Sequence, residues 1–223
     1  MRPPLLVLRP QPGAAVTAAA ASASGFAAIV APLFVVRPVD WSVPSPLPPA
    51  ILMTSANAAR HGGRALAPLT EMPLYAVGEA TAAAAREAGF ARVVVGTQGV
   101  DAIVAQAARD GIRDLLHLAG RDHRAPEDAL VGIRRRVVYA ADAVTALPEA
   151  AQAALPGAIV LLHSPRAATL FATLVDPRAL SVAAISPAVR AAAGGGWRAA
   201  AIADRPTDAS LLAAAAKLCD QNE

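Results

Sequence analysis

The chain has 223 residues, enough for one large domain or for two domains of about 100 residues each. Its hydrophobic fraction of 55% consists largely of alanine, and its formal net charge of +3 is carried almost wholly by arginine, since Lys217 is the only lysine. This mild and scattered positive charge suits an anionic ligand and is too weak to indicate binding to nucleic acid.

One uncharged stretch, residues 11–36, raises the question of a membrane segment. Pro12, Gly13 and Pro32 interrupt it, whereas a spanning helix needs about 20 strongly apolar residues. The N-terminus lacks the pattern of a cleaved signal peptide. The single cysteine, Cys219, allows neither a disulfide framework nor a thiolate metal site. We therefore expect a cytoplasmic protein without membrane contact.

Short aliphatic runs alternate with alanine-rich helical runs along the chain. The predicted strands are 5–10, 26–39 (interrupted at Pro32), 51–54, 74–77, 92–95, 115–118, 137–144, 158–162, 181–185 and 199–203. The predicted helices are 13–24, 57–66, 79–88, 100–109, 126–134, 149–154, 167–174, 188–193 and 208–218. This alternation predicts an α/β fold with parallel sheets covered by helices on both faces.

One structural pattern occurs twice. A strand, a serine turn, a helix, a strand, a small-residue turn and a helix run from residue 51 and again from residue 159. Strand counting predicts two similar α/β domains, of which one is discontinuous (1–37 plus 145–223) and the other is inserted as a block (38–144). The segments 29–39 and 137–144 would cross between them as a two-stranded linker. Two such domains would face each other across a cleft.

Ligands of open parallel sheets bind outside the carboxyl ends of the strands. Helices that begin there present free N–H groups and a dipole that favour anions. The candidate ligand-binding residues are therefore those that follow the strands, namely Arg9, Ser55, Asn57, Gly78, Thr81, Gly120, Arg121, Ser164, Arg166 and Ser186.

Simpler roles remain open for most of these residues. The three serines are good helix N-caps, and the two glycines suit turn geometry. The run Arg134–Arg136 reads as a solvated helix end, because basic side chains favour that position. His117 and His163 fall within predicted strands and read as hydrogen-bonded core histidines.

Several chemistries have no support. The chain contains no G-x-G-x-x-G, G-x-x-x-x-G-K-[ST] or G-x-S-x-G motif, so dinucleotide, P-loop and serine-hydrolase functions are not indicated. The four histidines show no metal-binding spacing. Catalysis would then rest on positioning and electrostatics rather than on a nucleophile, a metal or a cofactor.

An ordered set of short motifs resembles the uroporphyrinogen-III synthase family. The motifs are Leu6–Pro10, Thr54–Ala58, Ala76–Ala82, Leu118–Asp122, Val138–Tyr139, His163–Ala167 and Asp204–Leu212. Each motif is weak alone, but together they cover nearly the whole chain in the right order.

The resemblance implies two like domains with the active site in the cleft between them, a monomer, and no cofactor. The family cyclises hydroxymethylbilane with loss of water and inversion of the last pyrrole ring, in tetrapyrrole biosynthesis. This small-molecule substrate carries eight carboxylates, which fits a basic balance made of arginine. A tyrosine after the last strand of the inserted domain is thought to assist loss of the hydroxyl group, and Tyr139 occupies that place. Packing in the linker is the alternative role for Tyr139.

The chain departs from the family at one turn. The second G-x-x-T-A turn of the family is replaced by Ser186–Arg190, which lacks both the glycine and the threonine. This departure leaves open an alternative, namely a catalytically silent two-domain hinge protein that binds an anionic small molecule.

Overall fold

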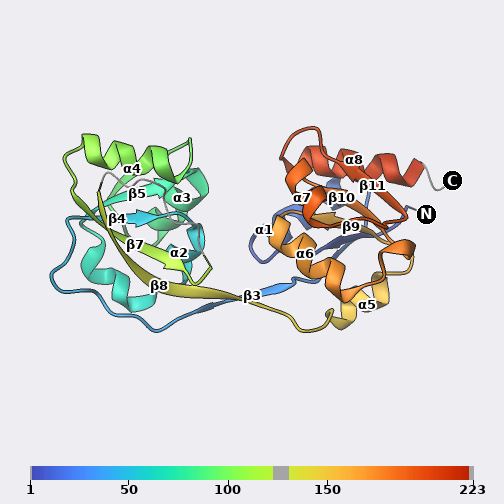
Figure 1. Ribbon diagram of the computed structural model, residues 1–223, viewed down its shortest axis with the longest axis horizontal. Coiled ribbons are helices and arrows are strands. Elements are labelled where there is room, and N and C mark those ends of the chain that lie inside the picture. Colours follow the sequence, from blue (N-terminus) through green and yellow to red (C-terminus); the bar gives the residue numbers. More distant parts are fainter. Residues whose placement is uncertain (1, 123–130, 221–223) are drawn as a thin grey trace. The chain divides into compact units, whose positions relative to one another are not determined.

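The computed structural model describes residues 2–122 and 131–220, which form two compact units. The first unit consists of Met1–Val35 and Ala143–Glu223, and the second is the inserted segment Val36–Asp142. Each boundary lies two residues before the expected one, at 35 rather than 37 and at 142 rather than 144. In each unit a sheet is covered by helices (Figure 1), which confirms the predicted α/β class.

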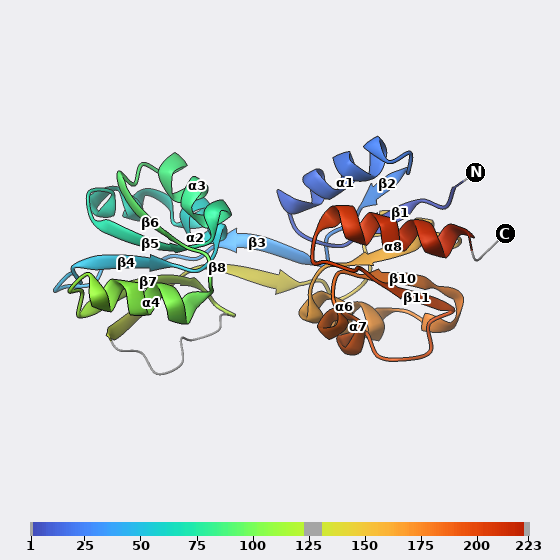
Figure 2. The same cartoon turned by 90° about the horizontal axis from the view of Figure 1, so that it is seen from above.

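The first unit has a sheet of five parallel strands. Its strands are β1 (Leu5–Val7), β2 (Ala28–Val30), β9 (Ile159–Leu162), β10 (Ser181–Ala184) and β11 (Ala199–Ile202). Its helices are α1 (Gly13–Ala23), α5 (Glu149–Ala154), α6 (Pro165–Leu174), α7 (Pro187–Ala192) and α8 (Asp208–Asp220), with a 3₁₀ turn at Pro177–Ala179. The strand order is β11-β10-β9-β1-β2. Figure 2 shows α1 and α8 together along this sheet, and their apolar residues share one core with it.

The second unit has a sheet of six strands in the order β3-β8-β7-β4-β5-β6. Its strands are β3 (Phe34–Pro38), β4 (Ala50–Met53), β5 (Pro73–Val77), β6 (Arg92–Gly96), β7 (Asp114–Gly120) and β8 (Gly132–Ala143). Its helices are α2 (Ala56–His61), α3 (Glu79–Glu87) and α4 (Val100–Arg109), with a 3₁₀ helix at Gly63–Leu69. The pairs β6/β5, β5/β4, β4/β7 and β7/β8 are all parallel.

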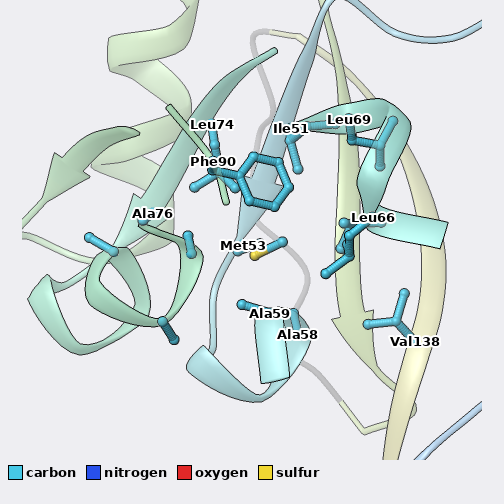
Figure 3. Close-up of a cluster of buried hydrophobic side chains, with 14 of the residues drawn as sticks. Ile51, Met53, Ala58, Ala59, Leu66, Leu69, Leu74, Ala76, Phe90 and Val138 are labelled. Carbon is cyan, nitrogen blue, oxygen red and sulfur yellow. The ribbon is translucent and has the colours of Figure 1, made fainter. Parts of the chain in front are cut away.

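The inner strands β1, β4 and β9 are apolar and buried throughout because both faces of each sheet are covered. Successive side chains point to opposite faces of a strand. In the second unit, Ile51 and Met53 therefore pack with α2 and α3 (Figure 3), whereas Leu52 packs with Tyr75 and Ile103 on the α4 side. Because alanine side chains are small, alanine-rich helices pack closely on these aliphatic strands, and the core between them contains few aromatic residues.

Three helices end in the same way, at a glycine that is followed by an apolar residue, and this pair is visible in the sequence. Gly89 follows the C-cap of α3 with φ 97°, a conformation that glycine adopts without strain. Its N–H donates to Arg86 O, and the N–H of Phe90 donates to Ala85 O. This is the Schellman motif, in which a glycine and a following apolar residue close the helix. The pairs Gly25-Phe26 and Gly111-Ile112 close α1 and α4 with the same bonds.

Strands β3 and β8 carry the chain from one unit to the other. They are antiparallel, because the N–H of Val39 donates to Val138 O and that of Val144 donates to Leu33 O, both at 3.0 Å. The single strand expected over 26–39 is in fact two strands, since β2 belongs to the first sheet and β3 to the second. The break surrounds Pro32, whose missing N–H cannot take part in a ladder.

The run Arg134–Arg136 lies in a strand, so its interpretation as a helix end is wrong. Residues from Gly132 onward form β8, which pairs in parallel with β7. The part of the expected helix over 126–130 lies outside the described residues. The run is polar, but the aliphatic residues Val137 and Val138 continue it, and on one side its residues pair with Leu116–Leu118 of β7. The guanidinium of Arg134 donates an exposed hydrogen bond to Pro46 O at 2.6 Å.

The two sheets have the same strand order once the chain connection is permuted. The order β6-β5-β4-β7-β8 in the second unit corresponds to β11-β10-β9-β1-β2 in the first, and all these neighbours are parallel. Strand β1 thus takes the place of β7. The repeated sequence pattern therefore corresponds to β4–β6 and β9–β11. Among the described helices, none is long and apolar enough to cross a membrane.

Candidate functional site

Each sheet has one point where the strand order changes direction. In the first unit this point lies between β1 and β9, and in the second it lies between β4 and β7. Ligands of such sheets bind outside the carboxyl ends of the strands at this point. Arg9 and Ser164 follow β1 and β9, and Ser55 and Arg121 follow β4 and β7. Four of the predicted residues therefore lie where the topology places a ligand.

A cavity of about 510 Å³ opens at the carboxyl ends of the strands in the second unit. It brings together two predicted residues, Ser55 and Tyr139. The other lining residues follow β4, β5, β6 and β7 or begin α4, and they are Thr54, Val77, Gln98, Gly99, Val100, Asp101 and Asp122. The lining combines hydroxyl, amide and carboxylate groups, so the cavity suits a ligand with hydrogen-bonding groups.

Tyr139 is held at this cavity by its neighbours on the sheet. Gly120 is its register partner on β7, and the pairing is irregular between Ala119 and Gly120. Such an irregularity re-aims a side chain. A Cβ atom at Gly120 would lie 2.6 Å from the Tyr139 ring, so only glycine leaves the ring its place. The ring of His61 lies 6.3 Å from that of Tyr139, centroid to centroid. The predicted Gly120 thus has a packing role beside any ligand contact.

Arg121 belongs to an ion-pair group on the crossing strands. Its guanidinium donates to Asp142 Oδ1 at 2.8 Å, and Arg37 donates to Asp142 Oδ2. The hydrogen bond from Arg37, with the positive charges of both arginines, holds the pKa of Asp142 below its ordinary value. About half of the Arg121 side chain remains exposed, so it can still meet an anion.

The three predicted serines all cap helices. Ser55 accepts a hydrogen bond from the backbone N–H two positions on at 3.2 Å, and Ser164 and Ser186 accept from those three positions on at 3.2 and 3.4 Å. The capping alternative therefore holds for each of them. Their helix N-termini point their free N–H groups toward the carboxyl edge of each sheet, where an anion would be stabilised.

The remaining predicted residues differ in accessibility. Gly78 begins α3 with φ 80°, and its N–H donates to Gly96 O at 2.7 Å. Thr81 is 4% exposed on the same helix, which leaves little of it for a ligand. Asn57 is half-buried in the first turn of α2. The exposed Arg166 lies 4.3 Å above the Phe34 ring in the first unit.

A polar cluster follows β1 and β9 in the first unit. Arg9 Nη1 lies 3.3 Å from Asp208 Oδ1, and the hydroxyl of Thr17 donates to Asp208 Oδ2 at 2.8 Å. His163 Nε2 lies 3.2 Å from Asp208 Oδ1. Burial lowers the pKa of His163 below 6.5, and the charge of Arg9 lowers it further, although Asp208 opposes both effects. Within residues 2–122 and 131–220, no group of three His, Cys, Asp or Glu side chains could hold a metal ion.

Sequence reasoning missed several of these residues. Gln98, Gly99 and Asp101 follow β6, which gave no candidate although β4, β5 and β7 did, and a short polar turn marks its end as clearly as theirs. Asp208 is the first residue of α8, the helix that follows the last strand, and an acidic residue at a helix start is also a recognisable signal. Thr17 lies in the middle of an alanine-rich helix, and no local pattern identifies it.

Two α/β units, each with parallel strands and with polar groups at the carboxyl ends of those strands, define a two-unit α/β protein of the class whose ligands bind at such edges. The family model for uroporphyrinogen-III synthase HemD matches residues 15–213. This chain therefore belongs to the uroporphyrinogen-III synthase family, which confirms the resemblance drawn from its motifs.

Similarity to a solved structure gives the same result for the fold. A uroporphyrinogen-III synthetase from Helicobacter pylori is similar with a TM-score of 0.67 at 18% identity, over 98% of this chain and 100% of that chain. A mutant uroporphyrinogen III synthase from Thermus thermophilus has a TM-score of 0.49 at 16% identity, over 99% of this chain and 100% of that chain. No curated protein matches the chain.

Proposed function

We propose that this chain is a cyclising hydro-lyase that converts hydroxymethylbilane into uroporphyrinogen III with loss of water. The family match over residues 15–213 carries the proposal. The arrangement of polar groups supports it, because helix N-termini and arginines lie at the carboxyl edges of both sheets, where the eight carboxylates of this substrate would be stabilised.

The cavity at Tyr139 suits the chemical step. When the carbon–oxygen bond of the hydroxymethyl group breaks, the leaving hydroxide must be protonated, and a positive charge develops on the pyrrole that it leaves. Tyr139 lines this cavity, and in this proposal its phenol donates a hydrogen bond to the leaving oxygen. Asp101 and Asp122 line the same cavity, and their charges would stabilise the cation while repelling the carboxylates of the substrate.

The altered turn does not weaken the proposal. Ser186 caps α7 just as Ser164 caps α6, so the replacement of the family turn leaves the helix start intact. No observation favours the catalytically silent alternative. The absence of a cofactor, the monomeric state and the cytoplasmic location stay predictions.

The rate of the reaction tests this proposal. Hydroxymethylbilane cyclises spontaneously, so its consumption is followed with and without the purified chain. We expect consumption to accelerate in proportion to the concentration of the chain, without added metal or cofactor. A rate equal to the spontaneous one, from a folded chain that binds uroporphyrin, would support the silent binding protein instead.

A further inference from the structure

The polar cluster at the start of α8 contains two largely buried side chains, His163 and Asp208, that have no role in the reaction proposed above. The side chain of His163 is 7% exposed, and that of Asp208 is 20% exposed. Among the described residues, none forms a hydrogen bond of good geometry with His163 Nδ1, which is buried. An ionised carboxylate only accepts hydrogen bonds, so His163 donates its Nε2–H to Asp208 at 3.2 Å.

Asp208 is held from three sides, which fixes its carboxylate. Thr17 and His163 come from α1 and from the end of β9, and Arg9 comes from the end of β1. The Thr17 hydroxyl has two acceptors within reach, Asp208 Oδ2 at 2.8 Å and Gly13 O at 3.1 Å, and the shorter bond to the charged carboxylate is the stronger. Its oxygen accepts from Arg9 Nη1 at 3.4 Å. Arg9 is thereby held through one nitrogen by two groups that are themselves fixed.

The other side of the Arg9 guanidinium is free for a ligand. Its Nε and Nη2 carry three N–H donors, and no described residue accepts from them. The side chain is 35% exposed. Gly13 lies beside this Nε/Nη2 edge, because a Cβ atom there would come within 2.5 Å of Nε and 2.7 Å of Nη2, and only the absence of a side chain at position 13 leaves the edge uncovered by it. A fixed guanidinium with an open Nε/Nη2 edge matches a carboxylate, which accepts two parallel hydrogen bonds.

The equivalent arginine of the other sheet lacks this support. Arg121 follows β7, the strand that corresponds to β1, and it too pairs with one aspartate. That aspartate, Asp142, is 39% exposed and is shared with Arg37, whereas Asp208 is 20% exposed and binds Thr17 and His163 in addition to Arg9. An exposed pair contributes little to positioning, because water screens it.

We infer that Asp208, with Thr17 and His163, is a positioning residue that holds the Arg9 guanidinium at the carboxyl end of β1, where its Nε/Nη2 edge binds one carboxylate of the substrate. This inference rests on the proposed function for the identity of the carboxylate. Asp208 itself does not touch the substrate, so its removal acts only through Arg9.

A double-mutant cycle tests the inference. The variants are Arg9→Ala, Asp208→Asn and both together, with Asp204→Asn as the matched control in an exposed part of the same segment. We expect Arg9→Ala to raise the KM for hydroxymethylbilane about tenfold and Asp208→Asn about threefold, with kcat little changed. In the Arg9→Ala background, Asp208→Asn should have no further effect on KM. The Asp204→Asn variant should behave as wild type.

The dissociation constant for uroporphyrin III, an octacarboxylate that needs no turnover, is measured over the same cycle by fluorescence quenching. A chain without turnover refutes the proposed function, and the binding cycle then still decides the role of Asp208. An unchanged constant in Asp208→Asn, an equal effect in both backgrounds, or no binding by the wild type overturns the inference. If Asp208→Asn fails to fold, Thr17→Ala replaces it, since alanine suits the helix and removes the same support.

Discussion

Tyr139 acquires its position from a residue without a side chain. Gly120 leaves the space that the phenol ring fills, and the resulting place lies on the wall of the cavity with Ser55. Linker packing and a chemical role are therefore not exclusive for Tyr139. The ring packs, while its hydroxyl is the part that can meet a leaving group.

Tyr139→Phe separates the two roles, because it keeps the ring and removes the hydroxyl. We expect kcat to fall by about 100-fold with a nearly unchanged KM, as for the loss of a general acid. Tyr75→Phe is the matched control, since Tyr75 is the only other tyrosine and donates to Asp110 at 2.8 Å, away from the cavity. That variant should lose stability but keep its kcat. Equal kcat values for wild type and Tyr139→Phe would leave the residue with packing alone.

His163 makes the stability of the chain depend on pH. Its pKa in the folded state lies below the ordinary value of 6.5, because it is buried and lies near Arg9. Below pH 6.5 the unfolded chain therefore binds a proton that the folded chain does not. The contribution of neutral His163 to the free energy of unfolding is fully present above pH 6.5, and it is lost as the pH falls from 6.5 toward the lower pKa of the folded state.

Thermal unfolding at pH 7.5 and at pH 5.5 measures this effect. We expect the melting temperature of the wild type to drop on acidification, and the drop to be smaller in His163→Gln, which keeps a polar side chain but does not titrate. His61→Gln is the comparison, because burial also lowers the pKa of His61 but the residue is less buried than His163, so its removal should reduce the drop less. The same drop in all three proteins would contradict this account of His163.

At the scale of elements, each N-capping serine can cap its helix and can also lie beside a bound carboxylate. Substitution by a charged capping residue separates these two roles. Ser164 accepts from the N–H of Ala167, and aspartate caps a helix as well as serine does. Ser164→Asp should therefore fold with an unchanged melting temperature.

The added carboxylate would repel a carboxylate of the substrate at the same helix start. We expect the KM for hydroxymethylbilane to rise by at least about threefold. Ser24→Asp provides the control, because Ser24 is exposed at the C-terminal end of α1 and not at a helix start. An unchanged KM in Ser164→Asp would show that this helix start only caps and does not bind the substrate.

Most elements could be predicted from the sequence because their boundaries have local causes. Helices that end at a glycine followed by an apolar residue, such as α3 and α1, carry the signal for their ending in a few letters. The run Arg134–Arg136 failed for the opposite reason. Its local composition suits a helix end, but pairing with β7 decides its conformation, and that partner lies far from it in the sequence.

The candidate site was predictable to the extent that it follows strand ends. Arg9, Ser55 and Ser164 were found because ligands bind at the carboxyl ends of parallel strands. Which of these residues meet in one cavity depends on strand order, and strand order is a long-range property. Asp208 and Thr17 surround Arg9 only because α8 and α1 lie on the same face of the sheet, which spacing along the chain does not reveal.

At the scale of the whole molecule, the repeat in the sequence is a repeat of sheet order with a permuted connection. Strand β1 occupies the position in the first sheet that β7 occupies in the second. The first unit is therefore built from two separate segments of the chain, whereas the second is built from one continuous segment. Arg9 and Arg121 thereby reach equivalent positions. The two copies have diverged in chemistry, since Tyr139 and its cavity belong to the second unit and the fixed Arg9 cluster to the first.

The isomer composition of the product tests the central claim most directly. The purified chain is supplied with freshly made hydroxymethylbilane, and the product is oxidised and resolved into its uroporphyrin isomers. If the chain closes the macrocycle with inversion of the last ring, the type III isomer will predominate, while the sample without protein gives type I. Type I alone in both samples would contradict the account.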